Sequence, residues 1–181
     1  MWKSRASGWL RGIEVVGVDP APYNIEQSAE TPAGTIPFPD SDFDLVTSRH
    51  ESYLPCEVNR VLASDGCFLT QQVASGASDD LYRLIGWPVP NVGIAWNLAF
   101  AVRQLEQSGF AIDEAAEGHV TKHFTDIGAL AWYLQHMPFM MPGFSIETAR
   151  DELLRIAEAQ KPLIIRQPWF WLKASKLDAA D

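Results

Sequence analysis

Apolar positions along this 181-residue chain alternate between short runs typical of buried strands and repeats at helical spacing. The β-branched run at residues 13–18 ends at Asp19-Pro20 and predicts a buried parallel strand. We expect further strands over 43–48, 67–73, 110–115 and 163–173, the last on the edge side of the sheet, and helices over 57–63, 95–107, 127–137 and 146–160. Because strand and helix patterns alternate, the fold class is α/β with a largely parallel sheet.

Turn and cap residues define the expected ends of these elements. Asp65-Gly66 suits a positive φ that would close the helix over 57–63. Asp126 and Ser145 are the expected caps of the helices over 127–137 and 146–160. The polar, proline-containing stretch 75–93 is expected to be a flexible connector. The expected buried positions of the last two helices are Ile127, Leu130, Ala131 and Leu134, and Ile146, Ala149, Leu153 and Ile156.

Composition narrows the class of protein and of partner. The net charge of −9 disfavours nucleic acid as the main partner, so a small-molecule substrate is the expected one. No apolar run is long enough to span a membrane, and the N-terminus lacks the apolar core of a secretory signal. Cys56 and Cys67 belong to no CxxC pair and are expected to be reduced thiols of a cytoplasmic protein. The four histidines lack metal-site spacing, so no metal site is expected.

Two segments carry a specific resemblance. Residues 36–46 (IPFPDSDFDLV) are similar to the "LPFPDxSFDLV" segment of class I S-adenosylmethionine-dependent methyltransferases of the methyltransferase type 11-like group. Residues 57–73 (EVNRVLASDGCFLTQQV) resemble the helix–turn–strand that follows it in that family, in the same order and at the same spacing. The segment 104–110 (QLEQSGF) is similar to a later helix-to-strand junction of the family.

This resemblance implies a Rossmann-like three-layer sandwich with S-adenosyl-L-methionine lying across the strand ends. Gly17 and Asp19 match the family's ribose-binding strand end, although Asp19 on its own favours a simple Asp-Pro turn. The loop that contains Asp40 would flank the adenine. Ser48 and Arg49 fall on the cofactor side of the strand end that lies beside the transferred methyl group.

The same strand end offers candidate catalytic groups. His50 and Glu51 could act as a base or as substrate anchors, because histidine titrates near neutral pH. The alternative is a solvated cluster of charges at a helix start, and the residues alone favour neither. The aromatic and methionine residues between 132 and 144 could line an apolar substrate pocket, but such stripes more often belong to core or lid packing.

The N-terminal region departs from the family pattern. No strand with a GxGxG-like loop precedes Glu14, so the first strand and the glycine loop are expected to be missing from a single, incomplete domain over residues 1–181. A truncated reading frame, a degenerate relative or a partner that completes the sheet would each explain this. The expected function is methyl transfer to a small molecule, and the alternative is an inactive remnant or binding module. A homo-oligomer or a sheet-completing partner is also considered.

Overall fold

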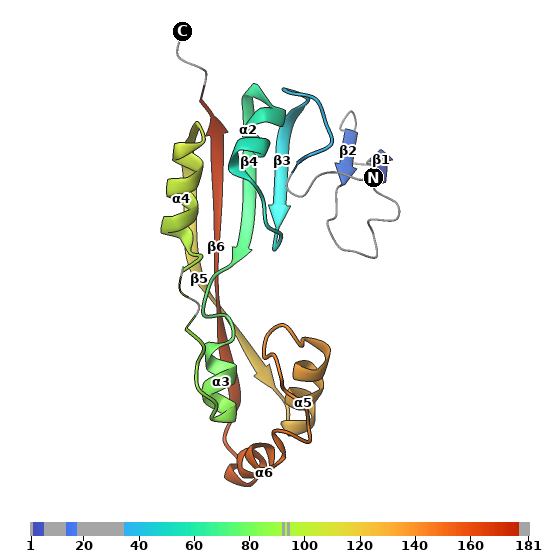
Figure 1. The fold of residues 1–181 in the computed structure, drawn as a ribbon, viewed down its shortest axis with the longest axis vertical. Coiled ribbons are helices and arrows are strands. Elements are labelled where there is room, and N and C mark those ends of the chain that lie inside the picture. Colours follow the sequence, from blue (N-terminus) through green and yellow to red (C-terminus); the bar gives the residue numbers. More distant parts are fainter. Residues whose placement is uncertain (1, 6–13, 18–34, 92, 94, 178–181) are drawn as a thin grey trace.

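The computed structural model describes residues 2–5, 14–17, 35–91, 93 and 95–177 (Figure 1). In chain order its elements are β1 (Trp2–Arg5), β2 (Glu14–Gly17), β3 (Phe43–Arg49), α2 (Pro55–Val61), β4 (Leu62–Val73), α3 (Asp79–Ile85), α4 (Leu98–Gln107), β5 (Phe110–Phe124), α5 (Ile127–His136), α6 (Arg150–Ala159) and β6 (Leu163–Lys176). The alternation of strands and helices confirms the α/β class.

The main sheet is mixed, so the expectation of a largely parallel sheet is wrong. Its strand order is β3-β4-β6-β5, with β3 parallel to β4 and both β4 and β5 antiparallel to β6. The chain passes from β4 to β5 through α3 and α4. After β5 it passes through α5 and α6 at the end of the sheet where β5 finishes, so β6 starts there and runs in the opposite direction. β6 therefore lies inside the sheet and not on its edge side.

β2 corresponds to the strand expected at 13–18, but its pairing differs from the expectation. It pairs antiparallel with β1 in a separate two-stranded sheet. Asp19, the expected ribose-binding residue, lies outside the described residues.

The junction between α2 and β4 also corrects an expectation. The helix ends at Val61, and Asp65-Gly66 lies inside β4 instead of closing the helix. A Cβ at Gly66 would stand 2.9 Å from the carbonyl oxygen of Ala63. Glycine is needed here because backbone approaches closely, and not because φ is positive.

The β5–β6 ribbon runs the length of the molecule and connects two apolar clusters (Figure 1). Near its lower end Leu163 and Ile165 pack into the cluster built with α3, α5 and α6. Near its upper end Phe170 and Leu172 pack into the cluster built with α2 and α4. The register between the two strands is unbroken over this stretch. The buried positions therefore change from odd to even because the ribbon twists, as two-stranded ribbons do strongly.

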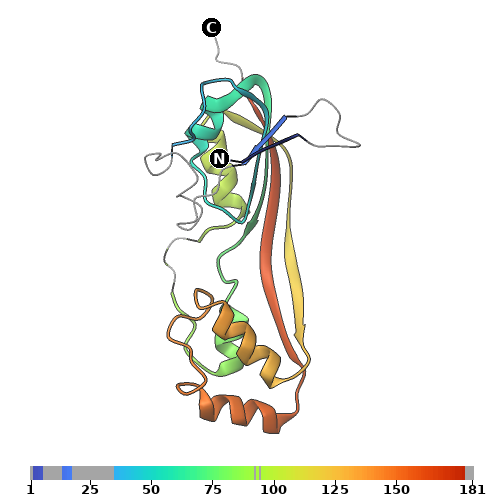
Figure 2. The same ribbon diagram turned by 90° about the vertical axis from the view of Figure 1, so that its right-hand side faces the viewer.

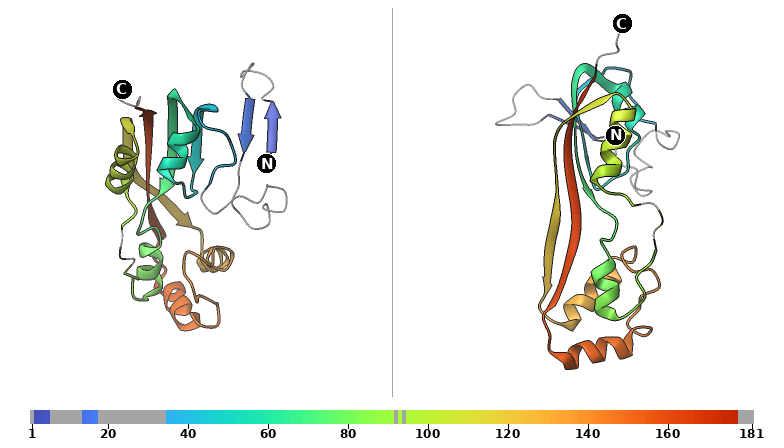
Figure 3. Two further views of the ribbon diagram at one scale, coloured as in Figure 1. Left: turned by 45° about the horizontal axis from the view of Figure 1, so that its top comes forward. Right: turned by 90° about the vertical axis from the view of Figure 1, so that its left-hand side faces the viewer.

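The described helices all lie on one side of the sheet (Figures 2 and 3). On β4, Phe68, Thr70 and Gln72 face them and are buried, whereas Leu69 on the other face is exposed. Leu45 of β3 is likewise exposed on that open face. The described part of the chain thus has two layers, and not the three that were expected.

One helix within the expected connector was missed. α3 buries Leu81, Tyr82 and Ile85 and ends at Gly86, whose φ is 92°. Two apolar residues four apart followed by glycine are a recognisable helix end. The caps agree better with expectation: Asp126 accepts a hydrogen bond from the backbone N–H of Ala129 at 2.8 Å.

The last helix before β6 starts later than expected. α6 begins at Arg150, because Ser145 accepts the backbone N–H of Thr148 in a preceding turn. Leu153 and Ile156 are buried as expected, but Ile146 is exposed.

Candidate functional site

The carboxyl end of β3 forms a tight turn that contains four of the candidate residues. Ser48 and Arg49 end the strand, and His50 continues its pairing by donating its backbone N–H to the Gln71 carbonyl at 2.9 Å. His50 has φ = 61°, a left-handed conformation that is uncommon for residues other than glycine. The Ser48 hydroxyl donates to the Glu51 carbonyl at 3.1 Å and closes the turn.

Two buried polar side chains lie directly beneath this turn. Thr70 and Gln72 of β4 are 0% and 4% exposed, and they are the buried polar residues of the described chain. The Gln72 amide nitrogen is 2.8 Å from the Thr70 hydroxyl, 3.1 Å from the Glu51 carbonyl and 3.3 Å from the Ser48 hydroxyl. The carboxyl end of a parallel strand pair, where ligands of open α/β sheets bind, is therefore polar inside as well as outside.

The candidate side chains at this turn point in different directions. Arg49 lies on the open face of the sheet, where its Nε donates to the Gln71 side-chain oxygen at 3.2 Å. Ser48 lies on the helix-covered face with Gln72. His50 and Glu51 are exposed. The structure therefore groups Ser48 with the backbone of Glu51 and separates Arg49 from them.

Sequence reasoning missed Thr70 and Gln72. A signal was present: in the run FLTQQV two polar residues occupy alternate positions on the same face as Phe68. Polar groups that are buried and hydrogen-bonded in this way specify one local arrangement.

Tyr53 is partly buried near this strand end and places a polar hydroxyl group among apolar side chains. Its ring packs edge-on against Phe68 and Trp96, with centroids 4.9 and 6.0 Å away. Its hydroxyl is buried and has no hydrogen-bond partner among the described residues. Burial raises the pKa of this phenol to about 12.

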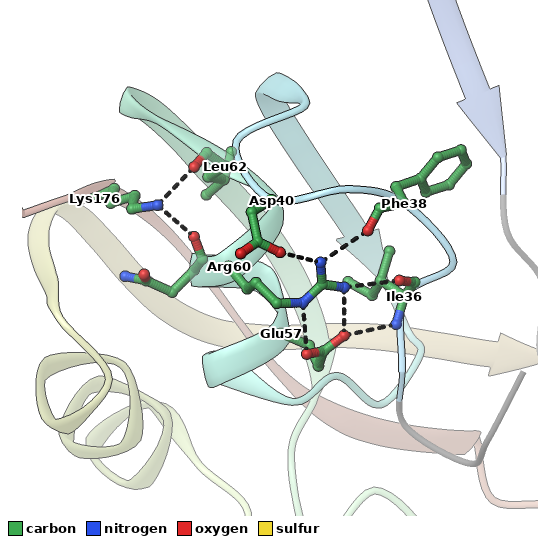
Figure 4. Close-up of polar contacts among 8 residues, drawn as sticks. Ile36, Phe38, Asp40, Glu57, Arg60, Leu62 and Lys176 are labelled. Carbon is green, nitrogen blue, oxygen red and sulfur yellow. Dashed lines mark hydrogen bonds and ion pairs between the residues drawn. The ribbon is translucent and has the colours of Figure 1, made fainter.

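Asp40 lies away from the turn, in a hydrogen-bonded hub around Arg60 (Figure 4). The Arg60 guanidinium donates to Asp40 at 2.8 Å, to both carboxylate oxygens of Glu57 at 2.8 Å, and to the carbonyls of Ile36 and Phe38. Glu57 also accepts the backbone N–H of Ile36 at 2.9 Å. The two sequence segments that carry the family resemblance are therefore joined here by one arginine.

This hub shifts the ionisation of both its central groups. Hydrogen bonds from Arg60, and then from the Ile36 backbone, lower the Glu57 pKa from 4.5 to about 2. Hydrogen bonds to Glu57 and Asp40 raise the pKa of Arg60. The side chain of Asp40 is 77% exposed despite its ion pair. Asp40 thus stays accessible to a ligand while it helps to fix the loop.

The carbonyls at the end of α2 have a further partner. Lys176 of β6 donates to the carbonyls of Asn59 and Leu62, each at 2.7 Å (Figure 4). A cation at a helix C-terminus satisfies carbonyls that lack partners within the helix. α2 is thereby attached to the interior strand of the sheet.

A polar cavity of about 250 Å³ opens where β4 leaves β6. It is lined by Ser75, Gly76, Asp79, Asp80, Arg83, His119, Arg166 and Pro168. Asp80 accepts the Arg166 backbone N–H at 2.9 Å and an Arg83 guanidinium hydrogen at 2.9 Å. The bond from the Arg166 backbone, the largest cause, lowers the Asp80 pKa. Asp80 thus accepts a backbone N–H of β6 at a position where β4 no longer pairs with that strand.

Most of the aromatic and methionine residues between 132 and 144 belong to a hydrophobic core. Met140 and Met141 are buried in the cluster with α3, α5 and α6, and Tyr133 and Phe144 pack against it. Trp132 and Phe139, however, are exposed.

Two further searches give negative results for the described residues. Within them, no group of three or more His, Cys, Asp or Glu side chains is arranged to hold a metal ion. Across the same stretches of chain, no helix is both long and apolar enough to cross a membrane.

Comparison with solved structures identifies the fold. A candidate methyltransferase from Bacillus halodurans C-125 superposes with a TM-score of 0.52 at 18% identity, over 82% of this chain and 70% of its own. The chain has a methyltransferase fold. The YcgJ protein from Bacillus subtilis gives a TM-score of 0.49 at 17% identity, over 87% of this chain and 76% of its own.

A geranyl diphosphate methyltransferase in complex with S-adenosylmethionine gives a TM-score of 0.40 at 12% identity, over 78% of this chain and 54% of its own. No protein-family model matches the sequence, and no curated protein matches it either. At these identities the likeness concerns the fold.

Proposed function

We propose that this protein carries out S-adenosyl-L-methionine-dependent methyl transfer to a small-molecule acceptor. The observation that carries the proposal is the polar strand end of β3 and β4, with Thr70 and Gln72 buried beneath the turn of His50. In a methyltransferase fold this edge is where a ligand is expected. The sequence resemblance of residues 36–46 and 57–73 supports the same function.

Polar groups at both ends of β3 fit a nucleoside ligand. The Ser48 hydroxyl lies at the carboxyl end of the strand, and the exposed Asp40 carboxylate lies in the loop before it. In this proposal Gly17 and Asp19 hold the ribose, Asp40 flanks the adenine, and Ser48 and Arg49 complete the cofactor side. The cofactor supplies an electrophilic methyl group bound to a sulfonium sulfur.

The contribution of the protein is positioning and proton removal. His50 and Glu51 are exposed at the strand end, where one of them would accept the proton of a hydroxyl or amine acceptor. Holding the acceptor nucleophile in line with the methyl carbon supplies most of the acceleration in such a displacement. The polar cavity begins at Ser75, four residues after Gln71, which is roughly 13 Å of extended chain. In this proposal it holds the distal end of the acceptor.

Binding of S-adenosylhomocysteine by isothermal calorimetry tests the proposal. We expect a micromolar Kd for the wild-type chain and a loss of at least about tenfold in Asp19→Ala, since one charged contact is worth about 1.5–3 kcal/mol. Asp151→Ala, which removes the same charge from an exposed position of α6, is the matched control and should bind as the wild type does. Absence of binding by folded wild-type protein would overturn the proposal and favour the inactive binding module. The cytoplasmic location and the oligomer or sheet-completing partner stay predictions.

A further inference from the structure

We infer that Gln72 is a positioning residue that holds the Ser48–Glu51 turn in a strained conformation and so presents His50 and Glu51 at the strand end. The inference rests on the proposed function for what the turn does, but its structural part stands on the contacts of Gln72 alone.

The position of Gln72 is unusual for a core residue. Thr70 and Phe68, two and four positions earlier on the same face, are fully buried. At position 72 the chain places an amide at 4% exposure where an apolar side chain would pack more simply. An amide is retained in such a place at a desolvation cost, so its hydrogen bonds must return that cost.

The hydrogen bonds of Gln72 converge on the turn. Its amide group has two hydrogens, and three oxygens lie within 3.3 Å of the nitrogen. Two of these oxygens, the Ser48 hydroxyl and the Glu51 carbonyl, belong to the turn and are bonded to each other at 3.1 Å. The buried Gln72 side chain therefore forms hydrogen bonds to both ends of the four-residue turn.

The turn needs these hydrogen bonds because His50 has a positive φ. A left-handed backbone at a residue other than glycine is strained, and it persists only where the surroundings fix it. The one backbone bond of His50 to β4, to the Gln71 carbonyl, fixes a single atom of the turn. Gln72 adds hydrogen bonds to the Ser48 hydroxyl and the Glu51 carbonyl, and the side chains of His50 and Glu51 depend on these bonds for their direction.

Amide hydrogen exchange of the Gln72→Met and Thr70→Val variants tests the structural part. Methionine matches the length of glutamine without its amide, so we expect the His50 amide to exchange at least about tenfold faster in Gln72→Met. Valine at position 70 removes a hydroxyl of the same cluster but keeps the hydrogen bonds of Gln72 to Ser48 and Glu51. The exchange rate of the His50 amide should therefore change less than about threefold. The β6 amides paired with β4 report global loosening and should be unaffected in both variants. Unchanged His50 exchange in Gln72→Met would overturn the inference, as would equal acceleration in β6.

Calorimetry with S-adenosylhomocysteine on the same variants tests the link to function. We expect about tenfold weaker binding in Gln72→Met and a smaller loss in Thr70→Val, which keeps the hydrogen bonds of Gln72 to the turn. Faster His50 exchange with unchanged binding in Gln72→Met would show that the turn does not serve the ligand, which overturns the positioning role. If the wild-type protein does not bind S-adenosylhomocysteine but the exchange result is as expected, the proposed function is wrong. The structural role of Gln72 in holding the turn is then still supported.

Discussion

Glu57→Gln is the most informative single change in the hub around Arg60. The carboxylate accepts three hydrogen bonds, two from the Arg60 guanidinium and one from the Ile36 backbone. Glutamine keeps the shape of the side chain but replaces one acceptor oxygen with an NH2 group that faces a donor. The substitution therefore removes an ion pair and introduces a donor–donor contact without creating a cavity.

The pKa of Glu57 gives the size of the expected effect. A fall from 4.5 to about 2 would correspond to about 3.4 kcal/mol of stability at neutral pH if fully realised. The Glu57 side chain is 18% exposed on a helix surface, so solvent screens part of this energy. We expect a loss of about 2 kcal/mol, which for a chain of this length lowers Tm by about 4–8 °C.

The pH dependence separates this explanation from a packing effect. Because the folded pKa is depressed, the stabilisation is fully present above the unfolded pKa of about 4.5 and is lost as the pH falls through about 2. The stability difference between wild type and Glu57→Gln should therefore shrink to less than half at pH 3. Urea unfolding at pH 7 and pH 3 measures it, with Glu158→Gln on an exposed site of α6 as the control expected to change stability by less than about 0.5 kcal/mol. A difference that is equal at both pH values would refute the reasoning.

Other regions of the molecule give three further predictions. Tyr53→Phe removes a buried hydroxyl without a described partner and should leave the urea midpoint unchanged or raise it; a loss above about 1 kcal/mol would show that the hydroxyl is bonded. Burial raises the pKa of the Cys67 thiol, so iodoacetamide at pH 8 should label the exposed Cys56 first, and faster labelling of Cys67 would contradict this. Asp80→Asn weakens the acceptor of the Arg166 N–H, so that amide should exchange faster at a cost of about 1 kcal/mol; unchanged exchange would mean the bond contributes nothing.

The sequence predicted the elements whose signals are local. β3, α4 and α5 occur close to their expected ranges, and the Asp126 cap is formed as its residue type predicts. Caps and helical spacing depend on residues within one or two turns of each other, so a single sequence contains their signal. The buried positions Leu130, Ala131 and Leu134 of α5 follow for the same reason.

For the candidate site, the sequence indicated the strand end but not how it is built. Ser48, Arg49, His50 and Glu51 do meet at the carboxyl end of β3, but the structure turns Arg49 to the open face. Gln72 forms hydrogen bonds to Glu51 and Ser48, which precede it by 21 and 24 positions in the sequence, and no local pattern encodes such contacts. The sequence predicts a ligand role for Asp40, whereas its ion pair with Arg60 was decided by the tertiary structure.

The interior position of β6 was decided by tertiary structure alone. The alternating pattern over residues 163–173 predicts an edge-side strand despite Pro168. The proline is accommodated because β4 parts from β6 there, so the missing N–H falls where the ladder ends, and the Pro168 carbonyl still accepts the backbone N–H of Ala74 at 3.1 Å. The twist of the long ribbon then turns Ile165 and Phe170, which have opposite parity along the strand, toward helices on the same side. Sequence periodicity records which residues are apolar, but the direction they face depends on a twist that accumulates along the whole strand.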